Sequence, residues 1–109
     1  MNNVGGETLV AANESVHRRI NEAIERGRWP GENDAMSFRC ECARPGCTGM
    51  LELTHEEYEQ LRDHPRRFAV LPGHQEPDVE AVVETRSGYL LVEKHGLAGQ
   101  IARATDPRS

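Results

Sequence analysis

All three cysteines of this chain lie within eight residues, and this cluster most constrains how the chain can fold. Cys40 and Cys42 form a C-x-C pair, and Cys47 follows after four further residues. Residues i and i+2 of a strand point to the same side, and a turn across Pro45-Gly46 can bring the third sulfur back toward the first two. The pattern predicts three thiolates that face one centre, as in a metal site.

Zinc fits these ligands best. Thiolates suit Zn2+ or iron, and structural zinc takes four tetrahedral ligands, commonly four Cys, three Cys and one His, or two of each. His74 is the predicted fourth ligand, because it follows a Pro72-Gly73 turn at the end of a predicted strand, where backbone geometry can aim its ring at the cysteines. Other occupants of the fourth position stay open: His55, His64, His95, His17, a carboxylate or water.

Two other interpretations of the cysteines compete with metal binding. They could be reduced thiols packed as small apolar side chains, or Cys40 or Cys42 could form a disulfide with Cys47. An odd number of cysteines leaves one thiol over in an all-disulfide framework. The clustering favours metal, because unrelated core cysteines have no reason to gather on a turn rich in Glu, Arg, Pro and Gly.

The composition suits one small domain. The chain has 109 residues, of which 37% are apolar, so we expect a modest core. Small domains of this kind are often stabilised by a bound metal. The net charge is -5 and the single lysine is Lys94, which argues against nucleic-acid binding. The sequence has no apolar run of membrane-spanning length and no signal-peptide pattern. We therefore predict a cytoplasmic location and no association with a membrane.

Hydrophobic periodicity predicts an α+β fold. A first helix is capped by Asn13 and ends at Gly27. The apolar residues on one face of this helix are Val16, Ile20, Ala23 and Ile24. His17 lies beside that face, where a surface or edge histidine is the expected outcome.

Strands and a short helix are predicted downstream. Met36, Phe38 and Cys40 alternate with polar residues as on a strand, and residues 50–53 resume an extended pattern after the cysteine loop. Thr54 and Glu57 form a capping box that begins a short helix.

The last third predicts a small antiparallel sheet. Residues 68–71 read as a strand, and a turn at 86–88 joins two further strands as a hairpin. In the first strand of the hairpin, Val79, Ala81 and Val83 alternate against Glu80, Val82 and Glu84. The predicted boundaries are a flexible N-terminus over 1–12, a metal-binding domain over 13–94 and a C-terminal tail over 95–109 that can hold a short helix.

Spacing excludes two classes of zinc enzyme. His74-Gln75-Glu76 has the H-x-E of zinc deaminases, but their cysteine pair lies downstream and every cysteine here is upstream. His55-Glu56 would need a histidine at position 59 to match a zinc protease, and that residue is Glu59. No other catalytic motif is present, so an enzyme is not the favoured reading.

Several short motifs together resemble a group of small uncharacterised actinobacterial proteins. The matching residues are Phe38-x-Cys40-Glu41-Cys42 with Cys47, Leu53-Thr54 with Glu57-Tyr58, Pro65, Phe68-x-Val70, Pro72-Gly73-His74 and Tyr89-x-x-Val92-Glu93-Lys94. The resemblance covers about residues 13 to 94. It implies that domain boundary and the pairing of the cysteines with His74, and it carries no known activity.

The leading hypothesis is a non-enzymatic cytoplasmic protein with a structural zinc held by Cys40, Cys42, Cys47 and His74, which acts as an interaction or regulatory module for another protein. The first alternative is an open three-thiolate zinc site with redox or catalytic chemistry. The second is a zinc knuckle that binds nucleic acid. The sequence leaves the oligomeric state open.

Overall fold

The computed structural model describes residues 4–29, 31 and 34–108, with side chains from residue 12 onward. Over these residues the chain forms a small domain of mixed helices and strands, as the α+β prediction required. The elements are α1 (Val4–Arg26), β1 (Met36–Arg39), β2 (Met50–Leu53), α2 (His55–Arg62), β3 (Arg67–Val70), β4 (Glu80–Arg86), β5 (Tyr89–Lys94) and α3 (Gly96–Ala104).

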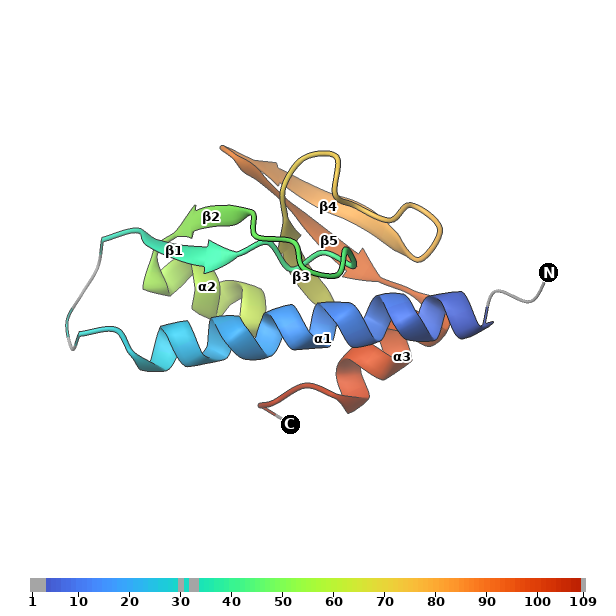
Figure 1. Ribbon diagram of the computed structural model, residues 1–109. Helices are drawn as coiled ribbons and strands as arrows, with labels where there is room; N and C mark the ends of the chain where they lie inside the picture. Colours follow the sequence, from blue (N-terminus) through green and yellow to red (C-terminus); the bar gives the residue numbers. More distant parts are fainter. Residues whose placement is uncertain (1–3, 30, 32–33, 109) are drawn as a thin grey trace.

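The strands form two antiparallel sheets that meet at the cysteine loop, residues 40–49 between β1 and β2. β1 pairs with β2, and the second sheet has the order β3-β5-β4. Beyond β1, the backbone amide of Glu41 donates to the carbonyl of Ala69 on β3 (2.8 Å), so the loop after β1 continues alongside the second sheet. Figure 1 shows α1 running along the length of the molecule across both sheets, with α3 beside it.

Two buried clusters form the core. The first lies between the β1-β2 sheet and α2, where the rings of Phe38 and Tyr58 stack with centroids 4.5 Å apart. The second packs Cys40 and Cys42 against Phe68 and other residues of β3 and β5. Two of the three thiols therefore lie in the hydrophobic core, which holds their backbone in a fixed place.

Two local predictions are confirmed. Thr54 caps α2, its side chain accepts from the amide of Glu57, and the Glu57 carboxylate accepts from the amide of Thr54. The predicted hairpin joins β4 to β5. Its alternation differs from the prediction. A bulge between Val82 and Glu84 shifts the register, and Ala81, Val82 and Val83 are all exposed.

The first helix differs most from the sequence pattern. It begins at Val4, so Asn13 lies inside the helix and does not cap it. The apolar face is largely exposed, and the buried face is polar. From residue 12 onward, the buried residues on α1 are Glu14, His17, Arg18, Asn21, Glu22 and Glu25. The physical reason is that α1 packs against backbone carbonyls of the cysteine loop and against buried cations, which polar side chains satisfy and apolar ones cannot.

Candidate metal centre

Two Pro-Gly turns of the same kind place two of the candidate ligands, Cys47 and His74. In Arg44-Pro45-Gly46-Cys47 the amide of the last residue donates to the carbonyl of the first (3.2 Å), and the same bond closes Leu71-Pro72-Gly73-His74 (2.9 Å). The glycine of each turn has a positive φ, 72° at Gly46 and 89° at Gly73, as the third residue of a type II turn requires. Each turn therefore delivers its final residue at a defined angle.

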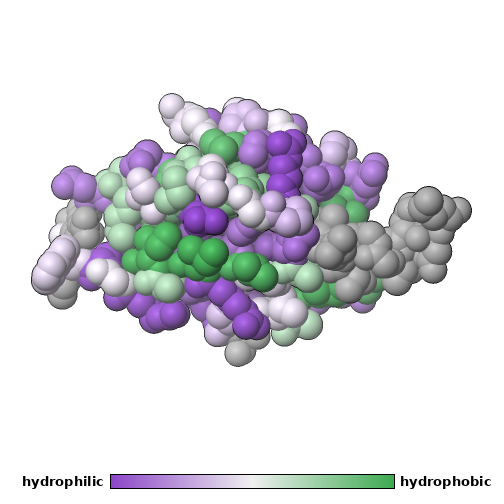
Figure 2. All heavy atoms as spheres, viewed as in Figure 1, coloured by the Kyte–Doolittle hydropathy of each residue, from purple (hydrophilic) through white to green (hydrophobic). Residues whose placement is uncertain are grey.

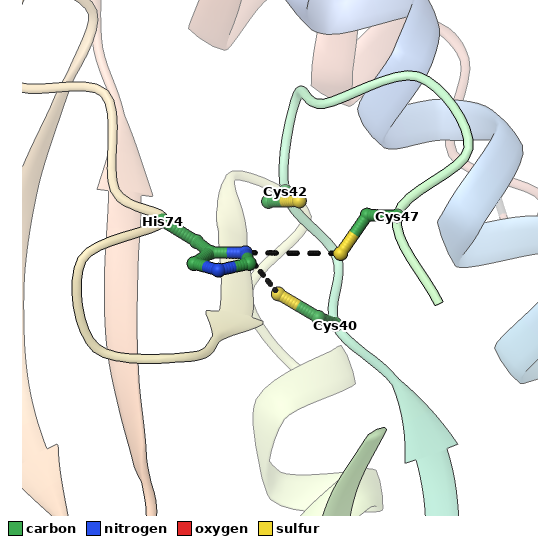
Figure 3. A group of neighbouring side chains, drawn as sticks. All are labelled: Cys40, Cys42, Cys47 and His74. Carbon is green, nitrogen blue, oxygen red and sulfur yellow. Dashed lines mark hydrogen bonds between the residues drawn. The ribbon is translucent and has the colours of Figure 1, made fainter. Parts of the chain in front are cut away.

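The four predicted residues lie together. The sulfur atoms of Cys40, Cys42 and Cys47 and a ring nitrogen of His74 all lie within 4.8 Å of one another. Figure 3 shows the His74 ring pointing into the space between the sulfurs of Cys40 and Cys47. This group is close enough to hold a metal ion.

Two of the distances between candidate ligand atoms agree with those in a tetrahedral metal site. His74 Nδ1 lies 3.6 Å from the sulfur of Cys40 and 3.7 Å from that of Cys47. With a Zn–S bond of about 2.3 Å and a Zn–N bond of about 2.0–2.1 Å, a tetrahedral zinc separates its sulfur and nitrogen ligands by about 3.6 Å. The nitrogen-to-sulfur spacing is therefore the one that a bound zinc would require.

Backbone amides support the sulfurs. The amide of Leu71 donates to the sulfur of Cys40 (3.2 Å), and the amide of Arg44 lowers the pKa of Cys42. Burial acts more strongly in the other direction, because it raises the pKa of Cys40 to about 12 and also raises that of Cys42. Thiols in this setting keep their protons at neutral pH until a cation displaces them, so metal binding would release protons.

Arg44 joins the turn before His74 to the turn before Cys47. The guanidinium of Arg44 donates to the carbonyl of Gly73 (3.0 Å), which links the two turns. Partial burial and, to a smaller extent, the charge of Arg44 lower the pKa of His74. A lowered pKa favours the neutral imidazole, which is the form that binds metals.

Helix α1 holds the cysteine loop through its polar face. The ring of His17 lies 2.7 Å from the carbonyl oxygen of Cys42. The side-chain amide of Asn13 donates to the carbonyl of Ala43 (2.9 Å). Asn21 bonds to both backbone groups of Arg39, at 2.6 Å to its amide and 2.9 Å to its carbonyl. The backbone from Arg39, at the end of β1, to Ala43 is thus bonded to α1 on three consecutive turns of the helix.

A buried ion pair lies between the cysteines and α1. Glu41, between Cys40 and Cys42, is completely buried, and its carboxylate accepts from Arg18 (3.2 Å) and Asn21 (3.0 Å). The Arg18 guanidinium also stacks 3.6 Å over the ring of Phe68. The ion pair with Arg18 holds the Glu41 side chain in the protein interior, on the side of the backbone opposite the two thiols.

The other histidines are placed elsewhere. Among the described residues, the group that is close enough to hold a metal ion does not include His17, His55, His64 or His95. His17 is buried and bonded to the loop backbone, so the expectation of a surface or edge histidine is wrong. His55 pairs with Glu25 at the far end of α1. All three cysteines are free thiols in the structure.

Sequence reasoning missed the supporting residues on α1. Arg18 and Asn21 are polar residues on a helix, and the sequence offered no sign that they are buried. A weak signal existed in Glu41, a charged residue between two thiols on a strand-like segment, where one side must face the core.

No helix in the described part of the chain is both long enough and apolar enough to span a bilayer. No protein family, curated protein or solved structure matches this chain. The resemblance to the actinobacterial group therefore stays a prediction, and the function has to be argued from the site itself.

Proposed function

We propose that this protein is a small zinc-binding module in which Cys40, Cys42, Cys47 and His74 hold one structural Zn2+, and that the domain built around the metal binds or regulates another protein. The observation that carries the proposal is the spacing of 3.6 and 3.7 Å from His74 Nδ1 to two of the sulfurs. Its cellular setting would be the reducing cytoplasm, which keeps thiols free for metal.

The ligand set favours a structural metal. A catalytic zinc usually has three protein ligands and keeps its fourth position for water or substrate, whereas here four protein side chains converge. Cys40 and Cys42 are fully buried, and Cys47 and His74 are half-buried. A metal with this shell has little room for a reactant.

The metal would stabilise the fold by joining segments that are far apart in sequence. Cys40, Cys42 and Cys47 belong to the loop between β1 and β2, while His74 follows β3. Binding energies of structural zinc are on the order of 10 kcal/mol, which is comparable to the total stability of a small domain. Because the same loop is bonded to α1, the metal would also fix the position of that helix.

Metal content tests the proposal. The purified parent protein should contain one zinc per chain by mass spectrometry of the metal, and Cys40→Ser and His74→Ala should lose most of it. His64→Ala is the matched control, since this exposed histidine lies outside the group, and it should keep its zinc. A parent with almost no zinc, or full occupancy in both ligand variants, would contradict the proposal.

A further inference from the structure

Helix α1 carries an apolar stripe on the side that faces away from the sheets. Val16 is 57% exposed, Ala23 is exposed and Ile20 is half-exposed. Their spacing of four and three residues places them on one side of the helix. Figure 2 shows a continuous hydrophobic stripe along the outward-facing side of α1. The buried polar side chains of this helix face the rest of the domain, and among the residues whose side chains the structure describes, Val16 and Ala23 are left exposed for another contact.

Basic residues border the stripe. Arg19 and Arg26 are exposed and lie one heptad apart, which puts both on the same flank. Within residues whose side chains the structure describes, neither forms an ion pair, whereas Arg18, Arg62 and Arg108 all do. The border is therefore cationic on a chain whose net charge is -5.

The stripe has the pattern of a two-helix seam. Val16, Ile20 and Ala23 fall at the positions that a coiled coil labels d, a and d, and Arg19 and Arg26 fall at g. Residues at g meet charged residues of the partner helix and select partners by charge. A helix with an apolar seam and carboxylates along its flank would match both features.

We propose that this outer face of α1 is a docking surface for an amphipathic helix of another protein, with Asp or Glu at the positions that face Arg19 and Arg26. The inference rests on the proposed function, because the metal-bound loop fixes α1 on the domain. A second copy of this chain fits less well. In an antiparallel pair Arg19 and Arg26 would face the same arginines of the second copy, where like charges repel. In a parallel pair they would face e positions such as Ile24, which offer no carboxylate.

The probe is a pair of synthetic helical peptides of about three heptads with Leu and Ile in the seam. One has Glu on its flanks and the other has Lys. Titration into zinc-loaded protein, followed by calorimetry, should show binding of the Glu peptide and none of the Lys peptide. Added salt should weaken the binding, because the flanking pairs are exposed to solvent.

Variants of the surface sharpen the test. Val16→Glu should weaken binding of the Glu peptide by about tenfold or more, because an apolar contact is lost and a like charge is added. Arg19→Glu with Arg26→Glu should reverse the preference, so that the Lys peptide binds. Val82→Glu is the matched control. Val82 is 46% exposed, lies on β4 outside the stripe, and its change should leave binding unaltered.

The outcomes separate the alternatives. Equal binding of both peptides, binding of neither, or indifference to the charge reversal overturns the proposal. A parent dimer in sedimentation that Val16→Glu dissolves assigns the face to a second copy, and binding to anionic phospholipid vesicles that Val16→Glu abolishes assigns it to a membrane surface; each result overturns it. Zinc content is measured on the same samples. A zinc-loaded parent that does not bind contradicts this inference alone, whereas a zinc-free parent contradicts the proposed function.

Discussion

The ring of His17 on α1 lies 2.7 Å from the carbonyl oxygen of Cys42, so the first helix is bonded directly to the backbone that carries the thiols. One turn further along α1, Asn21 pairs with both the amide and the carbonyl of Arg39. These contacts make α1 and the cysteine loop one structural unit. A change on the buried face of α1 should therefore alter the metal centre, and loss of metal should loosen α1.

Asn21→Ala should lower the free energy of unfolding by about 2–3 kcal/mol, because two backbone groups of Arg39 lose their partner and Asn21 also bonds the buried Glu41. Urea denaturation of the zinc-loaded protein measures this loss. Ser37→Ala removes an exposed bond to Glu52 and should cost less than about 0.5 kcal/mol. Equal losses in the two variants would contradict the account of how α1 is held.

Arg18→Met should destabilise the domain by about 3–5 kcal/mol, because it leaves the Glu41 carboxylate buried without a counter-charge. Adding Glu41→Leu to Arg18→Met should restore part of the lost stability, since the uncompensated charge is then removed. Chemical denaturation of the single and double variants measures both effects. A double variant that is less stable than Arg18→Met would show that the pair acts in another way.

The stability contributed by Glu14 should fall as pH rises. Burial raises the pKa of this carboxyl from 4.5 to about 7, although the ammonium of Lys94 lowers it. Between about pH 4.5 and 7 the folded protein then keeps a proton that the unfolded chain has lost, so the free energy of unfolding decreases with pH by up to ~3 kcal/mol. Glu14→Gln should abolish this decrease.

The measurement for Glu14 compares parent and variant at pH 5 and pH 8 with saturating zinc. The metal ligands contribute the same pH dependence to both proteins, so the difference in free energy of unfolding isolates Glu14. A difference that does not change between the two pH values contradicts the raised pKa.

Gly73→Ala should weaken metal binding, whereas Gly88→Ala should not. Both glycines have a positive φ, 89° and 87°, and a Cβ at either meets open space, so each alanine should cost about 1–3 kcal/mol from backbone strain alone. Only Gly73 precedes a candidate ligand. Competition with a zinc chelator should show a lower zinc affinity for Gly73→Ala alone, and equal affinities would mean that the turn does not position His74.

The sequence was informative where local rules decide the structure. The capping box at Thr54 and the β4-β5 hairpin depend on residues close in the chain, and both were predicted. The grouping of the cysteines with His74 was also predictable, because each Pro-Gly turn specifies its geometry locally.

The orientation of α1 could not be predicted in the same way. Its apolar residues form a face that any amphipathic helix would be expected to bury, but Arg18, Asn21 and Glu22 are buried instead. Their partners, including Glu41 and Arg62, come from segments distant in sequence. A polar face has the same periodicity whether it meets water or a buried ion pair, so the pattern alone carries no sign of the difference.

Zinc X-ray absorption spectroscopy of the purified parent protein measures the coordination of the metal. We expect three sulfur ligands at about 2.3 Å and one nitrogen ligand at about 2.0–2.1 Å. His74→Ala should lose the nitrogen contribution and His64→Ala should keep it. A zinc without sulfur ligands, or a nitrogen contribution that survives in His74→Ala, would show that these four residues do not hold the metal.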